Sequence, residues 1–116
     1  MTKREISIEK AVEQLRESGK LFTELFQHGT LSVEFYKPEK VDNQKPHDRD
    51  EIYVIASGAG TFHNGGNNWN FKTGDFLFVP AGVEHWFENF TEDFATWVFF
   101  YGPKGGEKNM LDTDDK

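Results

Sequence analysis

Residues 74–89 read GDFLFVPAGVEHWFEN, the most informative segment of the chain for its fold. It holds a short apolar run between two turns. Gly74 suits a tight turn at the start, and the fixed φ of Pro80 followed by the permissive Gly82 turns the chain again. A new strand is expected to begin at His85, where the side chain can point into the mouth of a barrel. Short strands joined by tight turns predict an antiparallel β fold.

The two-residue period of this stretch extends along most of the chain. From Leu21 onward, apolar residues alternate with polar ones, and turn residues recur at intervals of roughly 8–12 positions. The predicted strands cover residues 21–27, 30–36, 50–56, 61–63, 69–71, 76–79, 85–89 and 95–101. Strands this short and this evenly spaced indicate an all-β sandwich or barrel.

One helix is predicted before the strands, over residues 7–18. Ser7 is a suitable N-cap, and Gly19 is placed to end the helix in a left-handed conformation. The apolar positions at helical spacing are Ile8, Ala11, Val12 and Leu15. Because so short a helix is stabilised mainly by docking its apolar stripe, we expect it to pack on the outside of the barrel or on a partner subunit.

The length and the cysteine count limit the organisation of the chain. Its 116 residues give room for one domain. We divide it into an N-terminal helical segment (1–20), a barrel (21–103) and a flexible acidic tail (104–116). The sequence has no Cys, so it forms neither disulfides nor thiolate metal sites. Any metal must therefore be held by His, carboxylate or amide oxygen.

Charge and hydropathy argue against two classes of partner. The net charge of −7 disfavours binding to the phosphate backbone of nucleic acids, which needs a surplus of Lys and Arg. No apolar run is long enough for a signal peptide or a membrane span. We therefore expect a cytoplasmic protein with no nucleic-acid and no membrane partner.

Residues 74–89 resemble the second of two signatures of the cupin superfamily. That signature is Gly, five residues, Pro, one residue, Gly, two residues, His, three residues and Asn. Every offset is met here, by Gly74, Pro80, Gly82, His85 and Asn89. The resemblance covers about residues 31–101 and implies a double-stranded β-helix, or jelly roll. Together with the helix, the predicted fold is an all-β cupin barrel with one short N-terminal helix.

An earlier segment resembles the first cupin signature in part. That signature is His, one residue, His, three or four residues, Glu, six residues and Gly. Glu51 and Gly58 have the six-residue gap, and three residues separate His47 from Glu51. Lys45 occupies the place of the first histidine. Three of the four usual cupin metal ligands therefore carry over, as His47, Glu51 and His85.

Two histidines and one carboxylate are a sufficient set for one divalent metal ion. Such a set with open positions is used by non-haem Fe(II) oxygenases, and it suits Mn, Ni or Zn as well. Lys45 would be repelled by a dication, so we expect it to be an exposed loop residue. The amide oxygen of Gln44 is an alternative donor, although the position next to the expected one makes it the weaker choice.

Each of the three residues also has an ordinary interpretation. Taken alone, His47 would be a loop histidine, Glu51 a carboxylate at a strand edge, and His85 a hydrogen-bonded core histidine. Their joint spacing favours a site. His63 and His28 are expected near hairpin turns rather than as ligands.

Several further residues have a structural prediction. Arg49 and Asp50 are expected to pair on the surface, where an ion pair contributes little. Glu34 and Tyr36 are candidates for substrate binding or proton transfer if they face inward, and for Glu34 an outward position is equally compatible. The aromatic residues expected in the core or the cavity wall are Tyr53, Phe62, Phe76, Phe78, Phe87, Trp97, Phe99 and Tyr101. By strand parity, Phe87 shares a face with His85.

The resemblance leaves three classes of function open. The first is a metal-dependent enzyme acting on a small organic molecule, a dioxygenase with Fe or an isomerase type with Mn, Zn or Ni. The second is a non-catalytic module that binds a small ligand. The third is a barrel with a vestigial site, which Lys45 favours. We also expect a homodimer paired through edge strands, because an exposed edge is an aggregation hazard.

Overall fold

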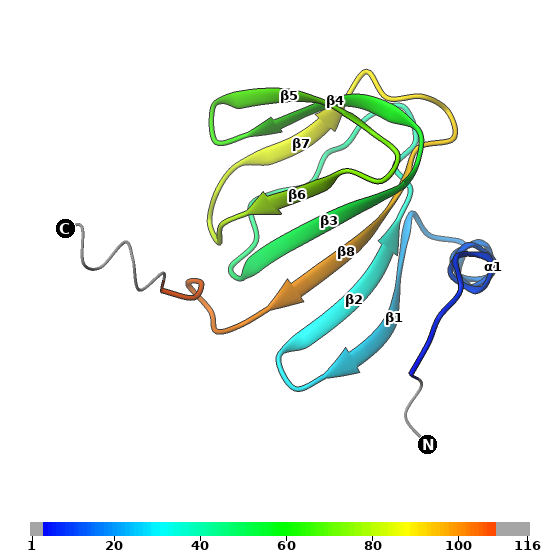
Figure 1. Ribbon diagram of the computed structural model, residues 1–116, viewed down its shortest axis with the longest axis horizontal. Coiled ribbons are helices and arrows are strands. Elements are labelled where there is room, and N and C mark those ends of the chain that lie inside the picture. The colour runs from blue at the N-terminus through cyan, green and yellow to red at the C-terminus, as the bar shows by residue number, and fades with distance from the viewer. Residues whose placement is uncertain (1–3, 109–116) are drawn as a thin grey trace.

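The computed structural model describes residues 4–108, in which one helix is followed by eight strands (Figure 1). The elements are α1 Ile8–Ser18, β1 Phe22–His28, β2 Leu31–Tyr36, β3 Asp50–Ser57, β4 Ala59–Asn64, β5 Asn67–Lys72, β6 Phe76–Val79, β7 His85–Glu88 and β8 Ala95–Tyr101. Among the described residues, no helix has the length and apolar character needed to cross a membrane. The prediction of an all-β fold with one short N-terminal helix is confirmed.

The strands form two antiparallel sheets. One has five strands in the order β1-β2-β8-β3-β6, and the other has three in the order β5-β4-β7. Strands far apart in the sequence are neighbours, since β8 lies between β2 and β3, and β7 pairs with β4. As a result, β3 and β7 belong to different sheets, and side chains from each can meet in the space between them.

The main core lies between the two sheets and is mostly aromatic. Its buried members are Tyr53, Ile55, Phe62, Phe71, Val79, Phe87, Phe94 and Val98. The ring of Phe87 packs 4.6 Å from that of Phe62 and 4.9 Å from that of Tyr53, measured between centroids. The parity prediction is confirmed, because Phe87 and His85 are both buried on the inner face of β7.

Four aromatic residues predicted for the interior lie outside the main core: Trp97 and Phe99 are half-buried on the outer face of β8, and Phe76 and Phe78 are exposed on β6. Phe76 is 62% exposed and Phe78 is 40% exposed, so their placement in the core or cavity wall was wrong. Both belong to β6, where Val79 is buried against the core. Because alternate residues of a strand point to opposite faces, inward Leu77 and Val79 leave Phe76 and Phe78 on the outer face.

The helix has the predicted caps and docks where predicted, on the outside of the five-stranded sheet. The Ser7 side chain accepts a hydrogen bond from the Lys10 N–H, and Gly19 ends the helix at φ 68°. Ala11 and Leu15 are buried in a second cluster with residues of β1, β2 and β8. The rest of the predicted stripe, Ile8 and Val12, stays 39% and 38% exposed. We attribute this to the position of α1 beside β1, the edge strand (Figure 1).

Asp50 does not pair with Arg49, so that prediction was wrong. Asp50 is 5% exposed, and its two carboxylate oxygens accept hydrogen bonds from the N–H groups of Ala81 and Glu107. The Arg49 guanidinium instead donates to the carbonyl of Thr30. Neighbours in an extended chain point to opposite sides, which separates the two charges.

The first part of the predicted tail is tied to the barrel. The Gly105 N–H donates to the Asp48 carbonyl at 2.7 Å, and the Glu107 N–H donates to Asp50 at 2.8 Å. Residues 109–116 of the tail predicted over 104–116 lie outside the described residues.

Candidate metal centre

The centre begins with two polar side chains that face each other between the sheets. Glu51 is on β3 and His85 is the first residue of β7, and each is 1% exposed. Glu51 Oε1 lies 3.1 Å from His85 Nε2. So deep a carboxylate and imidazole must be compensated, because a buried charge without a partner is very unfavourable.

The other nitrogen of His85 determines what this pair can bind. Nδ1 lies 2.9 Å from the Val83 carbonyl oxygen, which only accepts, so we assign the Nδ1 proton to that hydrogen bond. In the neutral ring, Nε2 then carries a lone pair directed at Glu51 Oε1. Both atoms are buried without a hydrogen-bond partner. Two acceptors at this distance repel each other unless a proton or a metal cation lies between them.

The electrostatics point in the same direction. Burial lowers the pKa of the His85 imidazole, but the close contact with the negatively charged Glu51 carboxylate raises it, and the net direction is upward. The pair therefore favours a positive charge at Nε2. A metal ion would supply that charge without a proton.

His47 completes a three-residue group from the loop before β3. Its Nε2 lies 3.8 Å from Glu51 Oε1, and its ring centroid is 5.3 Å from that of His85. One ligand atom from each of His47, Glu51 and His85 lies within 4.8 Å of the others. Ligand atoms on one ion are roughly 3–3.5 Å apart when the bonds are about 2.0–2.2 Å long. The group therefore fits a metal ion after a small approach of His47.

The structure thus brings together all three residues chosen from the sequence. Among residues 4–108, they form the only group of three or more His, Cys, Asp or Glu residues close enough to share an ion. Lys45, which stands in place of the first signature histidine, is exposed, as expected.

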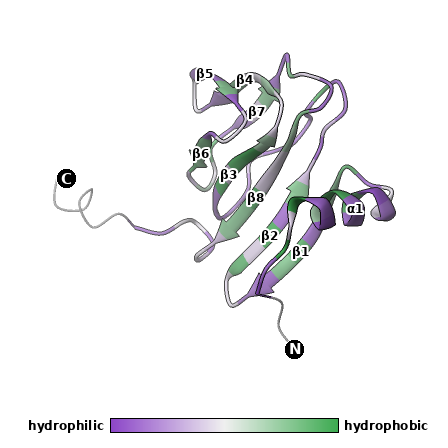
Figure 2. Ribbon diagram, turned by 45° about the vertical axis from the view of Figure 1, so that its right-hand side comes forward, coloured by the Kyte–Doolittle hydropathy of each residue, from purple (hydrophilic) through white to green (hydrophobic). Residues whose placement is uncertain are grey.

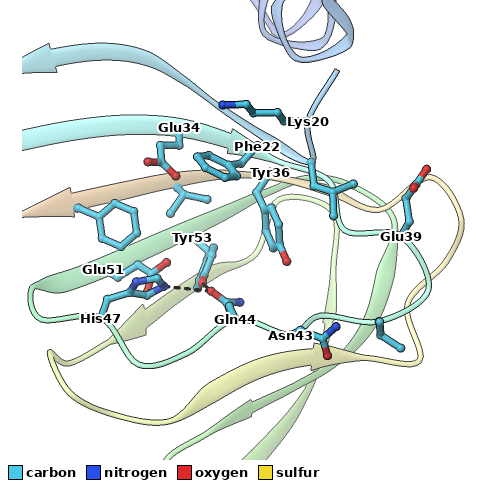
Figure 3. Close-up of a pocket in the computed structure, with 14 residues that line it drawn as sticks. Lys20, Phe22, Glu34, Tyr36, Glu39, Asn43, Gln44, His47, Glu51 and Tyr53 are labelled. Atoms are coloured by element: carbon cyan, nitrogen blue, oxygen red, sulfur yellow. Dashed lines mark hydrogen bonds and ion pairs between the residues drawn. The ribbon is translucent and has the colours of Figure 1, made fainter. Parts of the chain in front are cut away.

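Gln44 lies closer to this group than the sequence suggested. Its Oε1 is 3.2 Å from His47 Nε2, and the Tyr53 hydroxyl donates to the same oxygen at 3.1 Å (Figure 3). Burial, followed by the charge of Glu51, raises the pKa of Tyr53 well above its ordinary value, so the phenol keeps its proton and acts as a donor.

Asp42 is a buried residue that the sequence analysis missed. Its carboxylate accepts hydrogen bonds from the Tyr36 hydroxyl at 2.5 Å, the Gln44 amide at 2.6 Å and the Phe87 N–H at 2.9 Å. Asp42 thereby ties the loop before β3 to β2 and β7. Its position in a polar loop without a period gave no signal of this role.

A cavity of about 670 Å³ opens beside the centre. Glu34 and Tyr36 line it from β2 together with His47 and Glu51, so both side chains face inward (Figure 3). Burial, and then the charges of Glu24 and Glu51, raise the pKa of Glu34 to about 7, against a smaller lowering by Arg49. Burial and the hydrogen bond to Asp42 raise the pKa of Tyr36. Phe22, Val98 and Phe100 supply apolar walls.

The two remaining histidines of the prediction lie away from the centre. His63 is within β4 rather than at the hairpin tip, and its ring stacks on that of Trp86 at 4.5 Å between centroids. Its Nε2 is 3.1 Å from Glu88 Oε1. The strand predicted over 61–63 extends to Asn64, which pairs with Asn67 and His85, and begins earlier, at Ala59 and Gly60, which carry no strand signal. His28 ends β1 and is exposed next to the turn.

Comparison with known proteins places this geometry in a family. The cupin domain family matches residues 32–101. An uncharacterized protein of Streptomyces coelicolor is 32% identical over 85 residues, which cover 72% of this chain and 81% of that protein. The acireductone dioxygenase of Saccharopolyspora erythraea is 40% identical over 81 residues, 66% of this chain and 43% of the enzyme. This chain therefore spans less than half the length of the dioxygenase.

Solved structures agree on the fold. A cupin 2 conserved barrel domain protein from Salinispora arenicola superposes with a TM-score of 0.60 at 18% sequence identity, covering 70% of this chain and 74% of that one. At this identity the likeness shows the fold alone.

Proposed function

This chain belongs to the cupin domain family, and from that premise we propose that it binds one divalent metal ion through His47, Glu51 and His85 and acts on a small organic molecule. The observation that carries the proposal is the buried pair Glu51 Oε1 and His85 Nε2, 3.1 Å apart with no hydrogen-bond partner. Two buried acceptors this close need a positive charge between them. A cation held by both atoms would supply it.

The donor set indicates the metals to test and the chemistry they provide. Two imidazoles and a carboxylate suit Fe(II), Mn, Zn or Ni. When bound, such an ion acts as a Lewis acid on a substrate oxygen. The similarity to an acireductone dioxygenase supports the dioxygenase type over the isomerase type, with iron as the first metal and acireductone as the first substrate to test.

Glu34 is the residue that we assign to proton transfer. From β2 it points into the cavity, which His47 and Glu51 also line (Figure 3). Unlike Asp42, it takes no part in the hydrogen bonds that hold the loop before β3. A carboxyl group whose pKa lies near 7 can both give and take a proton at neutral pH, which suits general acid–base catalysis. Tyr36, two residues further along β2, holds Asp42 in place through its hydrogen bond.

Metal analysis of purified protein tests the proposal directly. We expect one equivalent of iron in the iron-loaded wild type, and a loss of affinity of more than about 100-fold in His85→Ala and His47→Ala, because each removes a ligand. His63→Ala is the matched control, since His63 lies outside the group, and it should bind like the wild type. Equal metal content in all four proteins would overturn the assignment. Oxygen uptake with acireductone then tests the reaction.

A second candidate is a non-catalytic module that binds a small ligand. The specific observation in its favour is Lys45, which replaces the first signature histidine and leaves only three ligands of the family set. Stoichiometric metal without turnover of acireductone or related substrates would favour this second function.

We also propose a homodimer, formed through the outer face of the five-stranded sheet. Phe76 and Phe78 of β6 stand opposite Val54 and Ile52 of β3. On the far side of β3, Val54 and Ile52 stand opposite Trp97 and Phe99 of β8. Figure 2 shows hydrophobic positions along these three strands. A hollow of about 470 Å³ lies on the same face, with Arg4, Glu5 and Ile6 at its N-terminal side and an otherwise apolar lining of Phe26, Leu31, Val33, Val54, Trp97 and Phe99.

This apolar face supports association because large exposed apolar patches are rare on monomers. A second copy of the chain presents the same patch, and a two-fold interface needs only one self-complementary surface. The face is a broader apolar surface than the strand edges expected from the sequence.

A further inference from the structure

We propose that Gln44 is the fourth protein ligand of the metal ion, through its amide oxygen, and that Asp42 positions it. The inference rests on the proposed metal site. It assigns the coordination position left by the missing signature histidine to a residue that the signature does not include.

Hydrogen bonds on both ends fix the orientation of the Gln44 amide. Its Nε2 donates to Asp42 Oδ2 at 2.6 Å, and a carboxylate can only accept. The oxygen must therefore point the other way. There it lies 3.2 Å from His47 Nε2 and accepts from the Tyr53 hydroxyl at 3.1 Å. The amide cannot flip without losing both contacts.

Asp42 is itself immobilised, so the orientation is set before any ion binds. It is 9% exposed and also accepts hydrogen bonds from the Tyr36 hydroxyl and the Phe87 N–H. Phe87 lies two residues after His85 on β7. Asp42 thus fixes the position of the Gln44 amide oxygen relative to β7, the strand that carries His85.

The local chain direction explains why Gln44 takes this role and Lys45 does not. Lys45 is exposed, whereas the preceding residue, Gln44, lines the cavity and points toward His47 and Tyr53 (Figure 3). Gln44 and His47, three residues apart, both face the cavity, so this loop does not alternate as a strand does. With lysine at the signature position turned to solvent, the adjacent residue faces the centre.

The oxygen has the capacity to coordinate. A carbonyl oxygen has two lone pairs, and Tyr53 uses one of them. The other faces His47 Nε2, which gives up its proton when it becomes a ligand. Amide oxygen is a hard, neutral donor that suits Mn and Fe(II) better than soft ions. The resulting set has two imidazoles, one carboxylate and one amide oxygen.

The test uses Co²⁺, whose visible absorption reports the number and type of its ligands. Wild type, Gln44→Ala, Gln44→Leu and the control Asn43→Ala are titrated with Co²⁺ against a competing chelator. Asn43 lines the same cavity next to Gln44 but makes none of these contacts, so it is the matched control. We expect both Gln44 variants to lose affinity by about tenfold or more and to change the Co²⁺ spectrum, while Asn43→Ala matches the wild type.

The outcomes separate this inference from the site on which it rests. If the wild type binds no Co²⁺, the metal site itself is refuted. If the wild type binds and His85→Ala does not, but the Gln44 variants keep the wild-type spectrum, then Gln44 is not a ligand. The same conclusion applies if the Gln44 variants bind Co²⁺ more weakly with an unchanged spectrum. In that case Gln44 only orients His47. Circular dichroism without metal shows that each variant is folded, and Gln44→Leu keeps the bulk of the side chain if Gln44→Ala is unstable.

Discussion

At the scale of single residues, the interior of the cavity is a connected set of polar groups. Tyr36 and Gln44 donate to Asp42, Tyr53 donates to Gln44, and Gln44 contacts His47. Each of these side chains limits the positions available to the next. Leaving one buried partner unsatisfied costs about 1–3 kcal/mol, so the set holds its geometry without a bound ion.

Glu34 gives a prediction about stability and pH in the metal-free protein. Its pKa is about 7 in the folded chain against an ordinary value of 4.5, so the folded state binds its proton more tightly than the unfolded state does. The stabilisation is present below the unfolded pKa and is lost as the pH rises through 7. Glu34→Gln never ionises, so its stability relative to wild type should improve between pH 5 and pH 8. We expect on the order of 1 kcal/mol, discounted for partial exposure.

Urea denaturation of both proteins with a chelator, at pH 5 and pH 8, measures this difference. A difference in unfolding free energy that is the same at the two pH values would contradict the prediction. Because a bound cation would lower the pKa of a nearby carboxyl, adding metal should reduce the pH dependence of the wild type.

The sequence predicted part of this site for a definite reason. His47, Glu51 and His85 could be chosen because the two family signatures fix the spacing of these ligands from the turn residues and of His47 from Glu51. Asp42 and Gln44 lie in a loop that has no period, and their contacts depend on tertiary packing. The hydrogen bond from Phe87 to Asp42 joins positions 45 residues apart, which no local pattern encodes.

At the scale of elements, the junction between β3 and β4 shows why the first signature ends in glycine. Gly58 has φ 88°, and a Cβ there would lie 2.6 Å from both the Phe94 Cα and the Thr91 Oγ1. The position therefore combines a left-handed backbone with a close approach of the chain before β8. No other residue type meets both requirements.

This feature predicts the effect of two glycine substitutions. Gly58→Ala should destabilise the protein by about 3 kcal/mol or more, because strain and a backbone clash act together. Gly29→Ala is the matched control, since Gly29 has φ 60° and no atom within 4 Å of the added Cβ. It should lose only about 1 kcal/mol. Thermal or urea unfolding measures both, and equal losses would refute the clash.

Element boundaries were predictable where caps and turns are strong. The helix begins after Ser7 and ends before Gly19 as expected, because both caps act locally. The start of β4 was missed by two residues, since Ala59 and Gly60 have low strand propensity and are held there by pairing with β5. Tertiary pairing overrides propensity at such positions.

At the scale of the whole molecule, the apolar outer face of the five-stranded sheet predicts the oligomeric state. We expect the wild type to sediment as a dimer and Phe76→Ser/Phe78→Ser to weaken association by about 100-fold, because exposed aromatic residues are strong interface anchors. Trp69→Ser is the matched control, since Trp69 is 49% exposed on the other sheet, and it should remain a dimer. A wild type that is monomeric at all concentrations would disprove the dimer.

The hydrogen bond between Asp42 and the backbone of β7 also allows opening of the loop that carries Asp42 to be measured. The Phe87 N–H donates to Asp42 Oδ2 at 2.9 Å in a buried setting. Its deuterium uptake therefore requires the loop to lift away, and the exchange rate of this single amide reports the fraction of time that the loop is open. Ligand traffic that depends on lifting the loop would draw on the same open population.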